Sequence, residues 1–137
     1  MRPNLHSVWI GVLVATLALC ALPTLAHHSF AAEYDANQPI TLEGKVLQVD
    51  LVNPHAWLYI EAADADGNLV RWNIEMNSPN ALIRQGINKN TVAVGTAVKI
   101  EGYRAKDGSN TVNSQTVTVG DGQPLFSGSR DTGVPER

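Results

Sequence analysis

The chain has 137 residues, with 10 basic and 13 acidic side chains, a formal net charge of −3 and a single cysteine. This acidic balance, without a basic patch, disfavours nucleic-acid binding. A chain of this length forms one small domain, and one cysteine cannot form an internal disulfide.

The first 26 residues are typical of a secretory signal peptide. Arg2 supplies a positive start, residues 8–22 are almost wholly apolar, and Ala26 is a small residue at a position that a signal peptidase recognises. The apolar run is shorter than the roughly 20 residues that a membrane anchor needs. We therefore expect cleavage after Ala26, a periplasmic product beginning at His27, and no membrane attachment after cleavage.

Residues 27–38 are polar and lack a periodic pattern, which favours an extended arm fastened to the domain by Phe30 and Tyr34. Residues 40–52 alternate as a strand does, but the apolar positions change from even to odd near Val46. Such a change of phase requires one extra residue, so the pattern predicts a β-bulge in a long, bent first strand that serves two sheet edges.

Two further strands are predicted over residues 55–62 and 69–76. A three-residue loop over residues 65–67, with its glycine in the left-handed conformation, would pair Ile60 with Trp72. That register keeps the apolar faces of the two strands together, whereas a two-residue turn would put them out of step.

A short helix is predicted next, because Ser78 suits the N-cap, Pro79 the first helical position and Gly86 the position just past the end. A helix of about two turns is unstable alone. We therefore expect Leu82 and Ile83 to dock on the rest of the domain.

The remaining chain contains two more predicted strands, residues 96–103 and 111–119, the second with another change of phase. Residues 88–95 are expected to form a loop in which Val92 and Val94 are tucked under. From Ser127 onward the sequence is too polar to bury anything and is expected to be disordered.

The predicted fold is all-β: a small five-stranded OB-like Greek-key barrel with one short helix between strands 3 and 4. The rival, an open β-sandwich, would need more strands at regular spacing. The expected organisation is a signal peptide (1–26), an N-terminal arm (27–38), the OB-like barrel (39–124) and a disordered tail (125–137).

Four segments in order are also familiar: His-His-Ser-Phe at residues 27–30, Val-Asn-Pro-His-Ala-Trp at 52–57, Asn-Ser-Pro-Asn-Ala-Leu at 77–82, and Gly-Tyr-Arg-Ala-Lys-Asp-Gly-Ser at 102–109. Together they resemble a family of short exported bacterial proteins that is known only as a domain of unknown function. The resemblance covers nearly the whole processed chain and implies no activity. The topology is also similar to other small periplasmic OB-fold proteins, a likeness of fold alone.

Three histidines remain after cleavage, and they form a candidate metal site: His27, His28 and His55. The free amine and the imidazole of His27 could chelate one ion, and His28 or His55 could complete a nitrogen set that suits Cu(II). Against this, neighbouring residues of an extended chain point in opposite directions, and His55 could simply hydrogen-bond the turn after Pro54.

A candidate ligand face lies on the outside of the second and third strands, where OB-folds commonly bind. The predicted register places its side chains together: Trp57, Tyr59, Arg71, Asn73 and Glu75. Exposed aromatic rings beside polar groups favour sugars, peptides or a protein. The alternative is that the arm covers this face, with Phe30 or Tyr34 on Trp57.

Catalytic signatures are absent from the sequence, which has no nucleophile elbow, phosphate loop or metalloprotease helix. Ser29 beside His28, or Asp50 and Glu75 near His55, do not establish a catalytic geometry. The sequence favours a periplasmic binding or accessory module with a small-molecule or protein partner. A copper-dependent oxidative enzyme with an N-terminal histidine chelate is the alternative.

Overall fold

The computed structural model describes residues 30–128, so the predicted leader, His27, His28 and residues 129–137 lie outside the described residues. The elements in chain order are α2 (Phe30–Glu33), β1 (Tyr34–Asp50), β2 (Trp57–Ala63), β3 (Leu69–Glu75), α3 (Pro79–Arg84), β4 (Ala97–Ala105), β5 (Thr111–Val119) and β6 (Leu125–Phe126). Neither helix within residues 30–128 has the length and apolar character that crossing a membrane requires.

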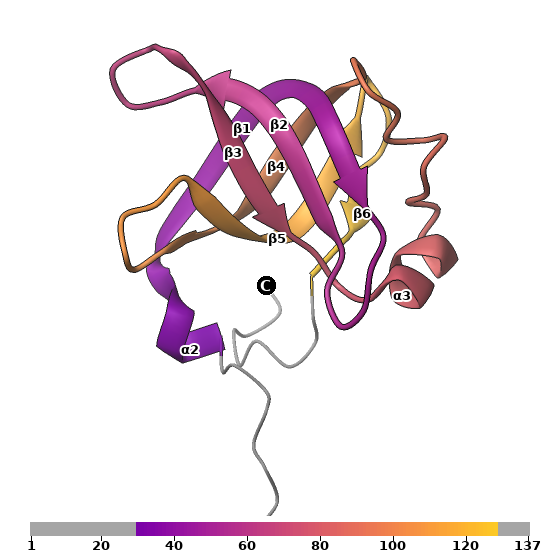
Figure 1. The fold of residues 1–137 in the computed structure, drawn as a ribbon, viewed down its shortest axis with the longest axis horizontal. Coiled ribbons are helices and arrows are strands. Elements are labelled where there is room, and N and C mark those ends of the chain that lie inside the picture. Colours follow the sequence, from indigo (N-terminus) through magenta and orange to yellow (C-terminus); the bar gives the residue numbers. More distant parts are fainter. Residues whose placement is uncertain (1–29, 129–137) are drawn as a thin grey trace, which may run out of the picture.

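The strands β1 to β5 form a ring (Figure 1). The first part of β1 pairs with β4, and its last part pairs with β2. The ring closes because β3 pairs in parallel with β5, and β6 adds a short strand outside β5. The predicted five-stranded OB-like barrel, with α3 between β3 and β4, is confirmed.

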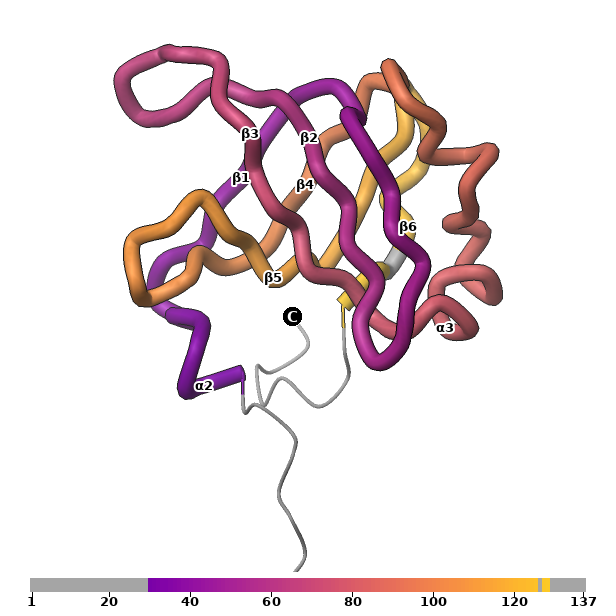
Figure 2. The backbone as a smooth tube through the Cα atoms, in the orientation of Figure 1, coloured from indigo at the N-terminus to yellow at the C-terminus, as the bar shows by residue number. Residues whose placement is uncertain are grey.

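The predicted bulge in the first strand is confirmed. The register of β1 against β2 shifts between Val46 and Gln48, so the two pairings are separated by one extra residue, Leu47. Figure 2 shows the resulting bend, which lets one long strand follow the ring from β4 to β2. Gly44 lies just before this bend and pairs with both neighbouring strands.

The hairpin of β2 and β3 also has the predicted register. Ile60 pairs with Trp72, and Gly67 has a positive φ of 83° in the connecting loop. Because this register keeps the apolar faces together, the ring encloses a continuous core. Its most deeply buried large side chains include Val46, Leu58, Ile60, Trp72, Ile74, Ile100, Val112 and Val117.

Three local expectations are corrected. The predicted extended arm is helical over Phe30–Glu33, where alanine and glutamate are good helix formers, and is extended from Tyr34 onward as part of β1. Leu82 of α3 docks on the core as expected, but Ile83 is 54% exposed, because successive side chains of a helix point about 100° apart and only that of Leu82 faces the core. Val92 is buried, whereas Val94 is 73% exposed.

The predicted disordered tail, residues 125–137, begins too early in the chain. Residues Leu125–Phe126 form β6, and Ser127, expected to bury nothing, is fully buried. The Ser127 hydroxyl hydrogen-bonds that of Ser114, and its backbone bonds Asn77 and Gln115. Polar composition was misleading here because the barrel supplies a hydrogen-bond partner for each of these groups.

Candidate functional site

The predicted ligand face comes from β2 and β3, and its cross-strand pairs are those expected: Tyr59 opposite Asn73 and Trp57 opposite Glu75. The side chains nevertheless divide into two groups. Tyr59 lies with Arg71 on the surface, where the Arg71 guanidinium is 4.1 Å from the centre of the tyrosine ring. Trp57 and Glu75 lie at the end of the hairpin, and the Glu75 carboxylate is nearly buried.

Glu75 is buried because its strand has a neighbour on each side. It pairs with Trp57 of β2, and it pairs with Asn113 of β5 where the two parallel strands close the ring. The end of β3, which would be exposed in an isolated hairpin, is therefore enclosed. A buried carboxylate needs hydrogen-bond donors, and Tyr34 supplies one from a distant segment of the chain.

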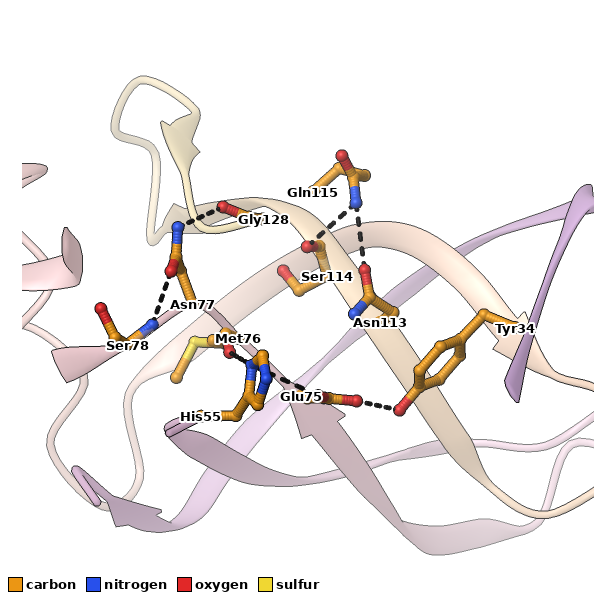
Figure 3. Close-up of polar contacts among 10 residues, drawn as sticks. All are labelled: Tyr34, His55, Glu75, Met76, Asn77, Ser78, Asn113, Ser114, Gln115 and Gly128. Carbon is orange, nitrogen blue, oxygen red and sulfur yellow. Dashed lines mark hydrogen bonds and ion pairs between the residues drawn. The ribbon is translucent and has the colours of Figure 1, made fainter. Parts of the chain in front are cut away.

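Tyr34 and His55 contact the two oxygens of the Glu75 carboxylate (Figure 3). The Tyr34 hydroxyl donates a hydrogen bond to Oε2, and His55 Nδ1 lies 3.4 Å from Oε1. Tyr34 comes from the start of β1, and His55 comes from the loop that follows β1. The carboxylate thus joins the first strand, the first loop and the end of the third strand.

Burial raises the pKa of the Tyr34 phenol well above its ordinary value, and its hydrogen bond to Glu75 and the negative charge of that group raise it further. Near neutral pH the phenol therefore keeps its hydrogen and acts as a donor to the carboxylate. Its ring is fixed as well, because Phe30 stacks on it with ring centres 5.7 Å apart.

The contacts of His55 define which ring nitrogen carries the hydrogen. Nδ1 lies 3.3 Å from the Met76 carbonyl oxygen, which can only accept, and it also faces the Glu75 carboxylate. We therefore assign the hydrogen of the neutral ring to Nδ1, which leaves a lone pair on Nε2. The side chain is 39% exposed, so His55 is held at one edge and accessible to solvent.

Of the predicted metal ligands, only His55 lies among the described residues. Within residues 30–128 no group of three or more histidine, cysteine, aspartate and glutamate side chains is placed to hold a metal ion. The pairing of Asp50 with His55, considered for catalysis, does not form: the Asp50 carboxylate accepts hydrogen bonds from Gln48. Ser29 and His28 lie outside the described residues.

Tyr34 is the site residue that the sequence did not reveal. Its contact with Glu75 spans 41 positions of the chain and depends on how the ring closes. The only signal in the sequence was the expectation that Tyr34 fastens the N-terminal segment to the barrel. The structure agrees with that role and adds the hydrogen bond to Glu75.

Comparison with known proteins assigns the chain to a family through its sequence. No curated protein and no solved structure matches it. A family model does match, over residues 14–114, which is most of the chain and includes Tyr34, His55 and Glu75. The chain therefore belongs to the family described as a family of unknown function, DUF6152.

Proposed function

We propose that the protein is a periplasmic binding module that holds a transition-metal ion, copper(II) in the first instance, through His55 together with His27 and His28. The leader-like first 26 residues support export and a processed chain that starts at His27. Imidazole nitrogens suit copper(II), and a free terminal amine beside an imidazole adds a further nitrogen ligand.

The observation that carries this proposal is the hydrogen bonding of His55. Metal-binding histidines usually donate the hydrogen of their other ring nitrogen to a carbonyl or a carboxylate, which fixes the ring and makes the free nitrogen more basic. His55 Nδ1 faces both kinds of acceptor, Met76 and Glu75, whereas no hydrogen bond of Nε2 occurs within residues 30–128. This arrangement supports a ligand role more than a mere turn-stabilising one.

The position of the first described residue also supports the proposal. Phe30 packs on Tyr34, Tyr34 is bonded to Glu75, and Glu75 contacts His55. His28 precedes Phe30 by two residues, and each residue of a chain spans at most about 3.6 Å. A processed chain that begins at His27 would start three residues before Phe30, which supports a site shared by its histidines and His55.

The test is a copper(II) titration of processed protein whose N-terminus has been verified by mass spectrometry, followed by calorimetry and electron paramagnetic resonance. His55→Ala should weaken affinity at least about tenfold and change the nitrogen hyperfine pattern, and Glu75→Gln should weaken it to a similar extent through the loss of ring orientation. Acetylation of the terminal amine of the processed chain should remove the contribution of that nitrogen.

The matched control keeps the number of imidazoles constant. In the double variant His55→Ala, Gln85→His, a histidine is placed on an exposed position after α3, and it should not restore the affinity. Equal copper affinity in the unmodified protein and in His55→Ala would show that the proposal is wrong. Copper-dependent oxygen consumption with a reductant would favour the oxidative enzyme that the sequence left as the alternative.

A further inference from the structure

A surface hollow of about 620 Å³ is lined by two neighbours of Glu75, namely Tyr34 and Trp57, and His55 is not among its lining residues. Its walls come from α2, the start of β1, the first residue of β2 and the β4–β5 loop. The residues that matter here are Glu33, Tyr34, Trp57, Asp107, Ser109 and Thr111. We call it the Trp57 hollow, and its volume is in the range typical of small-molecule sites.

We propose that the Trp57 hollow binds a neutral oligosaccharide, with one sugar ring lying on the Trp57 indole and its hydroxyls bonded to the β4–β5 loop. The inference does not rest on the proposed metal function, because His55, the described member of the three histidines, does not line the hollow. It also narrows the predicted ligand face to the Trp57 hollow and the predicted ligands to neutral sugars.

The indole of Trp57 is available for stacking. The ring contacts at this end of the barrel join Phe30 to Tyr34 and to Tyr103, with centres 5.7 and 5.5 Å apart. Among residues 30–128, no aromatic ring stacks on Trp57 and no guanidinium lies over it. The ring is half-buried, so it forms a fixed apolar wall for the C–H face of a sugar.

The opposite wall offers the polar groups that sugar hydroxyls need. The Asp107 carboxylate accepts a hydrogen bond of 2.9 Å from the Ser109 backbone, which holds it in place. The Ser109 hydroxyl donates to that of Thr111 over 3.0 Å, so Thr111 keeps a hydrogen to donate. One wall therefore presents both an acceptor and a donor, and a sugar hydroxyl can satisfy both.

The charge of the hollow favours a neutral ligand over a nucleic acid. Two carboxylates, Glu33 and Asp107, line it, and its one ammonium, that of Lys106, donates to the Ala31 carbonyl over 2.6 Å. The described lining residues therefore offer no excess of positive charge to a phosphate backbone. The hollow also lies where OB-folds bind oligosaccharides and oligonucleotides, beside the start of strand 2 and the loop between strands 4 and 5.

The test uses processed protein with a chelator present, so that the result is independent of metal binding. Cellotetraose and triacetylchitotriose are titrated while tryptophan fluorescence and saturation-transfer NMR are recorded. We expect a dissociation constant of about 1 mM. Trp57→Ala should weaken it at least about tenfold, Trp57→Phe should retain most of the affinity, and Thr111→Val should weaken it. Tyr59→Ala is the matched control and should bind normally.

Circular dichroism verifies the fold of each variant, and if Trp57→Ala does not fold, Trp57→Phe and Thr111→Val decide the question. The proposal is overturned if neither saccharide binds at about 1 mM. It is also overturned if an oligothymidylate or a basic peptide binds in their place, or if Trp57→Ala and Tyr59→Ala have equal effects. Failure of copper binding alone would leave these measurements unchanged.

Discussion

The hydroxyl of Tyr34 donates a hydrogen bond to the carboxylate of Glu75, and this contact joins the start of the first strand to the end of the third. The same carboxylate faces His55 with its other oxygen. One buried acidic group therefore couples the position of the N-terminal segment to the orientation of the exposed imidazole. Its placement between two strands gives the site a rigid support.

Removal of the Tyr34 hydroxyl should destabilise the fold. In Tyr34→Phe the buried Glu75 carboxylate loses its phenolic donor, and an unsatisfied buried group costs about 1–3 kcal/mol. Urea unfolding followed by circular dichroism measures the loss. Tyr59→Phe is the matched control, since no hydrogen bond of the Tyr59 hydroxyl occurs among the described residues. Equal unfolding midpoints for the two variants would contradict the prediction.

The stability of the protein should fall at alkaline pH because of Tyr34. Its pKa is raised in the folded state by burial and by Glu75, so the folded protein holds this proton more tightly than the unfolded chain. The stabilisation is complete below the ordinary tyrosine value of about 10 and is lost as the pH rises above it, at about 1.4 kcal/mol per pH unit.

This pH effect is measured as the difference between the unmodified protein and Tyr34→Phe, because lysines titrate in both proteins. Absorbance at 295 nm should show one of the three tyrosines ionising only together with unfolding. That step should be missing in Tyr34→Phe. Parallel stability curves for the two proteins above pH 10 would be inconsistent with a bonded, buried phenol.

Gly44→Ala should be strongly destabilising. A Cβ at this position would lie 2.2 Å from the carbonyl oxygen of Glu61, a backbone atom of the adjacent strand. Because Gly44 pairs with both β2 and β4, relief of the clash must displace part of the ring. We expect a loss of roughly 3 kcal/mol. Lys45→Ala, at the exposed neighbouring position, should stay within about 0.5 kcal/mol.

Local patterns predicted much of the barrel. The bulge near Val46 and the pairing of Ile60 with Trp72 follow from a side-chain period of two and from the length of one loop, so neighbouring residues determine them. The helix after Ser78 was likewise marked by Pro79 and Gly86. These features need no knowledge of how distant segments meet.

Contacts that depend on ring closure were not predictable in this way. Glu75 was expected on an outer face, but the parallel pairing of β3 with β5 encloses it. Ser127 was judged by its polarity, although Ser114 satisfies its hydroxyl inside the barrel. The roles of His27 and His28 remain predictions, since both lie outside the described residues.

The last strand should depend on Asn77, which connects it to the segment between β3 and α3. The Asn77 amide nitrogen donates to the Gly128 carbonyl over 2.8 Å, and its amide oxygen accepts from the Ser78 backbone over 2.7 Å. Asn77→Ala removes both bonds and leaves partly buried backbone groups unpaired. We expect a loss of about 1–3 kcal/mol in the free energy of unfolding, measured by urea denaturation.

Asn90→Ala provides the matched control for this variant, since Asn90 is exposed and only its backbone forms a hydrogen bond within the described part of the chain. It should change stability by less than about 0.5 kcal/mol. Hydrogen exchange would locate the effect, because Ser127 and Gly128 both donate backbone bonds to Gln115. Their amides should lose protection in Asn77→Ala but not in Asn90→Ala. Unchanged protection in both variants would contradict the prediction, because it would mean that the Asn77 side chain does not hold the segment after β6.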